Sequence, residues 1–401
     1  MVTIMKNNLN LSYTAVQGTY WMYFGAIIGF SSVFLLAKGY SNTEIGTILA
    51  LMNILSVFLQ PAFANFADRT KRFSLAQITG VFSVVLVALT ALLFLFPERS
   101  IALTVIFVVL GGLMMSLQPL INSIAFRYST FESPINYGVA RSGGSISYSV
   151  LSAVLGGIVL AIGPSAIPGV GLIILVLFLI ALYSTDTFYK TTPRIDDGYA
   201  QVIKDDTSIS FVQFLKRNKV LFVFSIGTLL VFFQNAIINN YLIQIIKPIG
   251  GTEGDMGRLF SFMAMLELPG LFFFNNIKRR LGCGNMIKIA SVAFIFKVFF
   301  TFTATSVMMV YFAFLFQIVS FPFYLAGSVH LVDEVLERGE AVKGQSLITG
   351  MMTLSAVFAS LLGGMILDSK GPSQLLMIST VLCILGSAVV IMTVGKIKSN
   401  K

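Results

Sequence analysis

The chain has 401 residues, of which 56% are hydrophobic and only 11% are charged. Soluble globular proteins carry about 25% charged residues, so this composition excludes that class and indicates an integral membrane protein. The formal net charge is +10, but the lysines and arginines are spread between apolar runs instead of forming one basic patch. We therefore expect membrane lipids, and no nucleic acid, among the partners of this protein.

Apolar segments long enough to cross a bilayer, about 20 residues each, recur along the whole chain. We predict twelve such helices, at Thr14–Ala37, Glu44–Phe66, Ser74–Phe96, Ile101–Phe126, Gly138–Ile162, Ile167–Tyr183, Val220–Ile246, Met256–Ile277, Asn285–Thr303, Val307–Val332, Gly344–Leu367 and Pro372–Val394. The longest polar stretch separates the sixth helix from the seventh. The sequence thus predicts an all-α membrane protein with a six-helix bundle at 1–183, a linker at 184–219 and a second, pseudo-symmetric six-helix bundle at 220–401.

Loop charge predicts the orientation of these helices. If both termini are cytoplasmic, the inside loops contain most of the cations: Arg69, Lys71, Arg72, the linker, Lys278, Arg279, Arg280, Arg338, Lys343 and the C-terminal lysines. The outside loops keep only scattered single cations. Because cytoplasmic loops are enriched in Lys and Arg, we predict a multi-pass protein of the bacterial cytoplasmic membrane with both termini inside.

A polar stripe marks the predicted fifth helix. Arg141, Ser145 and Tyr148 lie at i, i+4 and i+7, so one face carries a cation, a hydroxyl and an aromatic ring. An arginine in a membrane helix is a candidate functional residue, because it needs a partner, a cavity or the interface. The alternative is an arginine that snorkels to lipid phosphate.

Two further charges fall deep inside predicted helices. Glu267 lies near mid-bilayer, where a carboxylate must be paired, hydrated or protonated, and Pro269 and Gly270 follow it in a segment that can bend. Lys297 lies midway through the ninth helix and is a candidate counter-ion for a carboxylate such as Glu267. The alternatives are an interhelical hydrogen bond for Glu267, and a shift toward the neutral form or snorkelling for Lys297.

Amide and aromatic side chains supply further candidates. Gln234 and Asn235 lie in the seventh helix and Asn122 in the fourth. Amides both donate and accept hydrogen bonds, as recognition of a polyhydroxyl or nucleobase-like solute requires, although they also join helices to one another. Trp21, near the start of the first helix with Gln17, is either part of a site or part of an interfacial aromatic belt.

Several short stretches resemble the major facilitator superfamily. ADRTKR, from Ala67 to Arg72, is similar to a degenerate form of the signature of the loop between the second and third helices. INYGVARSGG and GRLFSFMAMLELPG resemble stretches of the fifth and eighth helices in the oligosaccharide:proton symporter branch, the branch of the lactose permease. The resemblance implies two parallel six-helix repeats with a solute site at their interface.

The resemblance also implies roles for matching residues. Arg141 and Glu267 stand where this branch has an arginine and a glutamate that bind sugar hydroxyls, and Lys297 stands at its ninth-helix arginine. Tyr148 replaces the tryptophan that stacks on the sugar ring, which preserves an apolar platform.

The departures from the branch concern proton coupling. Its tenth-helix histidine and glutamate appear here as Gln317 and Ser320. A charge pair of its seventh and eleventh helices appears as Asn235 and Met352, and its fourth-helix carboxylate as Ser123. Of the branch's deep carboxylates, only Glu267 remains to carry a proton.

We therefore predict a secondary transporter that moves a small polar solute, most simply a sugar or oligosaccharide, by alternating access with proton symport. The predicted solute-binding residues are Arg141, Tyr148, Glu267, Asn122, Gln234, Asn235, Gln317 and Trp21, and the predicted proton-coupling residues are Glu267 and Lys297. A nucleoside or organic-anion carrier, with Arg141 and Lys297 as anion ligands, and a receptor that binds without transport are the alternatives. We expect a monomer without cofactor or metal, and no enzyme, because the chain lacks a P-loop, an HExxH motif and a Cys/His cluster.

Overall fold

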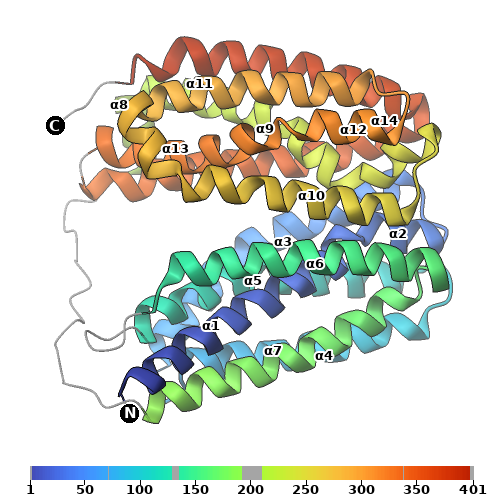
Figure 1. Ribbon diagram of the computed structural model, residues 1–401, viewed down its shortest axis with the longest axis vertical. Helices are drawn as coiled ribbons and strands as arrows, with labels where there is room; N and C mark the ends of the chain where they lie inside the picture. Colours follow the sequence, from blue (N-terminus) through green and yellow to red (C-terminus); the bar gives the residue numbers. More distant parts are fainter. Residues whose placement is uncertain (1, 71, 129–134, 192–209, 337, 398–401) are drawn as a thin grey trace. The chain divides into compact units, whose positions relative to one another are not determined.

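The computed structural model describes all residues except 1, 71, 129–134, 192–209, 337 and 398–401, and it leaves the side chains of 2–8, 68, 191, 338 and 339 undescribed. The described chain consists of helices joined by short turns (Figure 1). The helices of the N-terminal part are α1 (Val2–Phe24), η1 (Gly25–Gly29), α2 (Ser31–Ala37), α3 (Asn42–Arg69), α4 (Leu75–Leu92), η2 (Leu93–Leu95), α5 (Ile101–Tyr128), α6 (Tyr137–Ile162) and α7 (Ala166–Thr191). The remainder are α8 (Phe211–Arg217), α9 (Lys219–Ile246), η3 (Lys247–Ile249), α10 (Glu253–Phe272), α11 (Phe274–Phe302), α12 (Val307–Phe314), α13 (Gln317–Val335) and α14 (Arg338–Val394).

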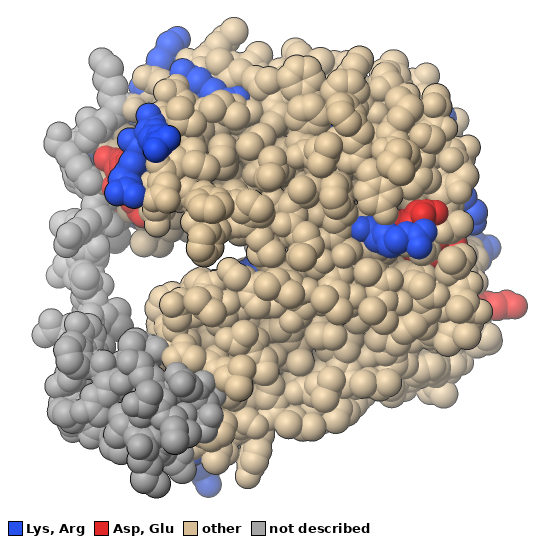
Figure 2. Space-filling model, viewed as in Figure 1, with Lys and Arg blue, Asp and Glu red and all other residues tan. Residues whose placement is uncertain are grey.

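Many of these helices are long and apolar enough to cross a membrane. Nine of the described helices qualify by length and composition, or ten if the bent pair Leu9–Gly29 and Ser31–Ala37 is one span. On the face seen in Figure 2, Lys, Arg, Asp and Glu gather mainly near the ends of the helices, and other residues fill the surface between them. The protein is therefore an integral, multi-pass membrane protein, as its composition predicts.

The predicted segments fall on helices, but several boundaries differ. The eighth predicted segment was drawn to Ile277, whereas α10 ends at Phe272 and α11 begins at Phe274. The last two segments form one element, α14, which turns at Gly371 with φ of +78°. A residue with a side chain rarely adopts this φ, so glycine marks the junction. The count of twelve spans stays a prediction.

The helix starts follow from local capping. Ser41 and Glu44 form a capping box at α3: the backbone N–H of Glu44 donates to Ser41 Oγ at 3.2 Å, and that of Ser41 donates to the Glu44 carboxylate at 2.8 Å. Ser74 and Gln77 form the same arrangement at α4. Each box satisfies backbone donors that the first turn of a helix leaves unpaired.

The chain divides into two compact units. The first unit comprises Met1–Asp197 and Thr252–Met265, and the second comprises Gly198–Gly251 and Leu266–Lys401. In the first, α1 packs on α6 and α7, and α3 packs on α5; in the second, α9 packs on α14, and α11 packs on α13. The predicted boundaries at 183 and 219 stay a prediction, and most of that linker lies outside the described residues. Helix α10 is shared, so that Glu267 lies just inside the second unit.

Candidate solute-binding and proton-coupling residues

The guanidinium of Arg141 lies over the ring of Trp21 in the first unit. The guanidinium carbon of Arg141 lies 4.1 Å from the centre of the Trp21 ring, and Arg141 Nη1 donates a 3.1 Å hydrogen bond to Ser145 Oγ. The i, i+4 stripe predicted for α6 therefore places cation and hydroxyl together. A guanidinium over an indole face is an attractive cation–π arrangement. Sequence reasoning named both residues but could not pair them.

Glycines bring α1 and α6 close enough for this contact. A Cβ atom on Gly144 would lie 2.6 Å from Trp21 Cδ1, and one on Gly18 would lie 2.8 Å from Ser147 Oγ. Because contacts under about 3 Å force neighbouring atoms to move, only glycine fits at these positions without a shift. The small residues of the YGVARSGGSISY stretch thus allow the Trp21 ring to lie against α6.

Tyr148 lies against an irregular part of the first span. Its ring approaches Gly25, where a Cβ atom would come within 3.1 Å of Tyr148 Cδ2, and its hydroxyl approaches Gly29. Gly25 and Gly29 bound the π-helical turn η1. Such π-turns are rare and often occur at functional sites. The structure thus places the predicted stacking residue beside the bend between α1 and α2.

Asn122 belongs to a hydrogen-bond network that joins α1 to α5. The amide nitrogen of Gln17 donates to Asn122 Oδ1 at 3.1 Å and to the Tyr13 hydroxyl at 2.7 Å. The Tyr13 hydroxyl in turn donates to the carbonyl of Ile121 at 3.1 Å. Gln17 and Tyr13 are buried and were not among the predicted site residues. The signal that could have found Gln17 is its polar side chain in an otherwise apolar run.

Glu267, Gln317 and Lys297 form a continuous chain in the second unit. Lys297 Nζ donates to Gln317 Oε1 at 2.7 Å, and Gln317 Nε2 donates to Glu267 Oε1 at 2.8 Å. Lys297 is 0% exposed and Gln317 1% exposed, whereas Glu267 is half-buried. The sequence suggested Lys297 as a counter-ion of a carboxylate such as Glu267. In the structure, the amide of Gln317 lies between these two groups.

The local shape of α10 and α13 explains this bridge. Gln317 is the first residue of α13, immediately after the break that separates it from α12. Helix α10 approaches α13 closely, because a Cβ atom on Gly270 would lie 2.6 Å from the carbonyl oxygen of Ile318. Glu267 precedes Gly270 by nearly one turn, so this close approach brings the carboxylate to the start of α13. The Pro269–Gly270 pair noted in the sequence therefore positions Glu267.

The predicted amide residues of α9, Gln234 and Asn235, lie in a buried environment. Gln234 is 0% exposed, and among the described residues neither of its amide atoms has a hydrogen-bond partner. It lies two helical turns from both Gly227 and Tyr241, on one face of α9. Gly227 packs against Val390, and Tyr241 packs against Gly363, so this face contacts α14. Gln234 therefore lies at a helix–helix contact, and Asn235 beside it is 8% exposed.

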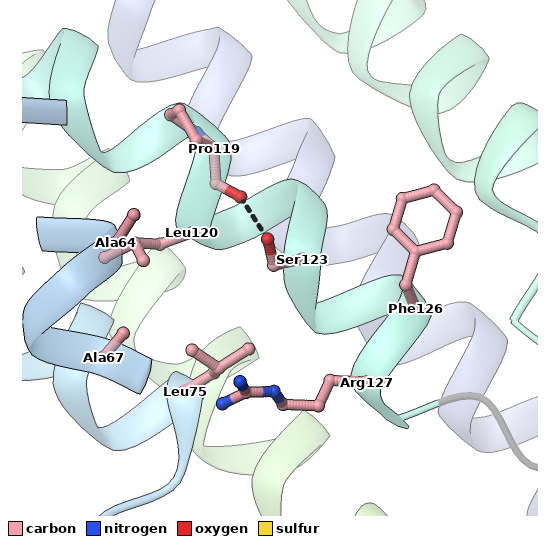
Figure 3. A pocket seen from close by; sticks show the side chains of 8 residues that line it. All are labelled: Ala64, Ala67, Leu75, Pro119, Leu120, Ser123, Phe126 and Arg127. Atoms are coloured by element: carbon pink, nitrogen blue, oxygen red, sulfur yellow. Dashed lines mark hydrogen bonds between the residues drawn. The ribbon is translucent and has the colours of Figure 1, made fainter. Parts of the chain in front are cut away.

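A cavity of about 340 Å³ lies elsewhere in the first unit (Figure 3). Residues of α3, α4 and α5 line it, namely Ala64, Ala67, Leu75, Pro119, Leu120, Ser123, Phe126 and Arg127. The Ser123 hydroxyl donates to the Pro119 carbonyl at 2.8 Å. None of the predicted site residues lines this mostly apolar cavity. We therefore do not place the solute there.

The single histidine belongs neither to the residues around Arg141 nor to the chain of Lys297, Gln317 and Glu267. His330 Nδ1 lies 3.3 Å from Lys278 Nζ, and its ring stacks on Phe274 at 5.1 Å between ring centres. Lys278 also forms an ion pair with Glu334 at 2.9 Å. Within the described residues, no group of three or more His, Cys, Asp and Glu side chains is arranged to hold a metal ion. His330 thus belongs to a charged contact between α11 and α13.

Comparison with known families agrees with this fold. The profile of the MFS_1 like family matches residues 13–378, which is most of the chain. The chain therefore belongs to this family, and it is a membrane transporter of the major facilitator type. This membership confirms the resemblance to major facilitator transporters found in the sequence.

Two relatives belong to the same class. The chain is 24% identical over 334 residues to the "Uncharacterized transporter YwbF" of Bacillus subtilis (strain 168), covering 81% of this chain and 79% of that protein. It is 26% identical over 271 residues to the maltose permease of Geobacillus stearothermophilus, covering 67% of this chain and 64% of the permease. These relatives are transporters, a class distinct from enzymes.

Solved structures share the fold. The nucleoside transporter NupG matches with a TM-score of 0.73 at 15% identity, over 98% of this chain and 100% of that chain. A bacterial homologue of the iron transporter ferroportin, in an inward-facing state, matches with a TM-score of 0.71 at 15% identity, over 98% and 99% of the two chains. At these identities the likeness shows the fold alone.

Proposed function

We propose that this protein is a proton-coupled transporter of a sugar or oligosaccharide that works by alternating access. The observation that carries the proposal is the hydrogen-bonded chain from Lys297 through Gln317 to Glu267. Charged groups in membrane helices are costly and mark ion or solute pathways. A fully buried lysine linked to a half-buried carboxyl group is therefore a candidate coupling device.

The bridging amide tolerates both protonation states of Glu267. An ammonium group can only donate, so the carbonyl oxygen of Gln317 must face Lys297 and its NH₂ group must face Glu267. The NH₂ group can donate to a carboxylate and also to the carbonyl oxygen of a protonated carboxyl group. A proton can therefore bind Glu267 without breaking the chain, while the net charge of the group rises by one. This property suits a carrier that must accept and release a proton.

The residues of the first unit suit a polyhydroxyl solute. Arg141 offers several donors, Trp21 and Tyr148 offer aromatic faces, and Asn122 offers an amide, a mixture that matches the hydroxyls and apolar faces of a sugar ring. The similarity to a maltose permease supports the same solute class. In this proposal, the solute-binding residues of the first unit are Arg141, Trp21, Tyr148 and Asn122. Those of the second unit are Glu267, Gln234, Asn235 and Gln317.

A nucleoside or small organic anion is the second candidate solute. The aromatic face of Trp21 can stack on a base, and Arg141 and Lys297 can bind an anion. The family of solved structures with this fold includes a nucleoside transporter. A receptor that binds without transport is the remaining alternative, and transport assays distinguish it.

We further propose that the protein lies in the bacterial cytoplasmic membrane as a monomer with both termini in the cytoplasm. The distribution of Lys and Arg between alternate loops supports this orientation. Cysteines introduced near either end of the chain, labelled with a membrane-impermeant thiol reagent, test it. Labelling of intact cells at either end would contradict the proposed orientation.

Reconstituted protein tests the proposed function. Proteoliposomes with an imposed inward proton gradient would be assayed for uptake of labelled maltose, uridine and benzoate. We expect maltose to accumulate above its external concentration and a protonophore to abolish the accumulation. Accumulation of uridine or benzoate instead would show that the solute is a nucleoside or an organic anion and not a sugar. Saturable binding without counterflow would indicate a receptor.

A further inference from the structure

Two polar atoms of α1 are buried without partners. Among the described residues, neither Gln17 Oε1 nor Trp21 Nε1 has a hydrogen-bond partner, and both atoms are shielded from solvent. Gln17 is 0% exposed as a whole, whereas the Trp21 ring is half-buried. The two residues are four positions apart, so they lie on the same face of the helix. Buried polar groups are nearly always hydrogen-bonded, so two exceptions on one face of the same helix require an explanation.

The surrounding network fixes which atom of Gln17 lacks a partner. The Tyr13 hydroxyl donates its hydrogen to the Ile121 carbonyl, so it can only accept from Gln17. The second amide hydrogen of Gln17 goes to Asn122 Oδ1. Both hydrogens of the Gln17 amide are therefore used, and the atom left over is its carbonyl oxygen. Because an indole nitrogen can only donate, the pair consists of one acceptor and one donor.

A hydroxyl group is the complement of this pair. Its oxygen accepts from Trp21 Nε1, and its hydrogen is donated to Gln17 Oε1. A carboxylate or phosphate has no hydrogen to donate, so an anion would leave Gln17 Oε1 unpaired and would be repelled by it. Arg141, over the Trp21 ring, remains close enough to donate to a neighbouring oxygen of the same ligand.

We propose that Gln17 and Trp21 form a subsite for one hydroxyl group of the transported solute, which is therefore a hydroxyl-bearing molecule. This inference rests on the proposed transport function and specifies the solute class. Both atoms are covered in this conformation, so the hydroxyl reaches them when the Trp21 ring turns or when the Arg141 guanidinium moves off it. Binding therefore changes the environment of Trp21.

The protein supplies its own probe for this change, because Trp21 is its single tryptophan. Full-length protein in nanodiscs would be titrated with maltose, its single-deoxy analogues, uridine, the deoxyuridines and benzoate, while Trp21 emission is followed. We expect emission to change saturably with a transported hydroxyl solute. One deoxy analogue should bind about tenfold more weakly than its parent, the loss of about one hydrogen bond.

A conservative variant tests the assignment of that hydroxyl. Trp21→Phe keeps an aromatic ring under Arg141 and removes the N–H group together with part of the indole. Binding of labelled maltose or uridine should weaken about tenfold more in Trp21→Phe than binding of the sensitive deoxy analogue, because only the parent solute loses a hydrogen bond. In Tyr183→Phe, a substitution at an exposed tyrosine of α7, all affinities should equal those of the unmodified protein.

The outcomes separate this inference from the proposed function. If maltose is transported but every deoxy analogue binds equally well, or Trp21→Phe binds maltose with unchanged affinity, the subsite is wrong and the function stands. If uridine is transported in place of maltose and one deoxyuridine binds weakly, the proposal of a sugar as the solute is wrong and the proposed subsite stands. If benzoate is the ligand, or no hydroxyl-bearing probe binds, the subsite is overturned.

Discussion

Lys297 places its ammonium group 2.7 Å from the amide oxygen of Gln317, and both side chains are shielded from solvent. This is a charged donor bonded to a neutral acceptor, with the compensating carboxyl group of Glu267 one hydrogen bond further away. The arrangement fixes the amide orientation and connects α10, α11 and α13. Several outcomes of mutagenesis follow from it and from the close helix contacts.

Gln317→Leu should destabilise the protein. The substitution keeps most of the side-chain volume but removes the acceptor for Lys297 and the donor for Glu267, and leaving a buried charged group without its partner costs about 1–3 kcal/mol. Thermal unfolding in nanodiscs would measure a lower Tm. The control is Ser320→Ala on the same helix, since the buried Ser320 hydroxyl has no partner among the described residues. Its removal should leave Tm unchanged or higher, and equal losses in both variants would contradict the role of the bridge.

Lys297→Met should be rescued by a second substitution. Alone, it removes the cation that lies one hydrogen bond beyond Gln317 but keeps the carboxyl group of Glu267, so a buried charge loses its compensating charge. In the double variant with Glu267→Gln, both charges are removed and the amide chain from Gln317 can persist. We expect the double variant to unfold at a higher temperature than Lys297→Met. Additive losses in this double-mutant cycle would show that the two charges do not interact.

Gly156→Ala should weaken the contact of α6 with the first part of α10. A Cβ atom on Gly156 would lie 2.9 Å from the Cα atom of Gly257 and 2.9 Å from the Glu253 carbonyl oxygen. These are backbone atoms that cannot turn away, so we expect a loss of about 1–3 kcal/mol from overpacking. Gly157→Ala is the matched control, because among the described residues no atom outside its own stretch of helix would lie within 4 Å of a Cβ atom at this position. Unfolding curves of the two variants that coincide would refute this packing.

Arg141→Lys should impair solute binding more than it impairs folding. Lysine retains the charge, but it lacks the planar fork that lies over Trp21 and bonds Ser145. We expect the apparent KM for uptake to rise about tenfold, Trp21 emission to shift, and Tm to change little. Arg99→Lys, at an exposed ion pair with Glu44, serves as the control with unchanged KM. An unchanged KM for Arg141→Lys would remove Arg141 from the binding residues.

Much of the architecture follows from the sequence. Long apolar runs predicted the helices, and the stripe of Arg141 and Ser145 was predicted from helical spacing because both residues lie on one regular helix. The residues at which helices end or bend were harder to predict. The end of α10 at Phe272 and the turn at Gly371 depend on backbone angles, which the apolar runs on either side do not reveal. Spacing in the sequence therefore located spans better than it located their ends.

Contacts between different helices could not be predicted in this way. Trp21 and Arg141 are 120 positions apart, and their contact depends on Gly144 allowing close approach. Gln17 was noted beside Trp21 but was not predicted as a site residue, because the missing partner of its carbonyl oxygen becomes visible only when both hydrogens of its amide are accounted for. Likewise, the sequence suggested Lys297 and Glu267 as a pair but did not place Gln317 between them.

The most direct test of the account is accumulation by Glu267→Gln in proteoliposomes under an imposed proton gradient, compared with Glu44→Gln, which changes an exposed carboxylate of α3. Glutamine can still accept the hydrogen bond from Gln317 but cannot take up a proton. We predict that Glu267→Gln retains solute counterflow, loses gradient-driven accumulation and loses the pH dependence of uptake, whereas Glu44→Gln behaves as the unmodified protein. Undiminished accumulation and an unchanged pH profile in Glu267→Gln would contradict the account.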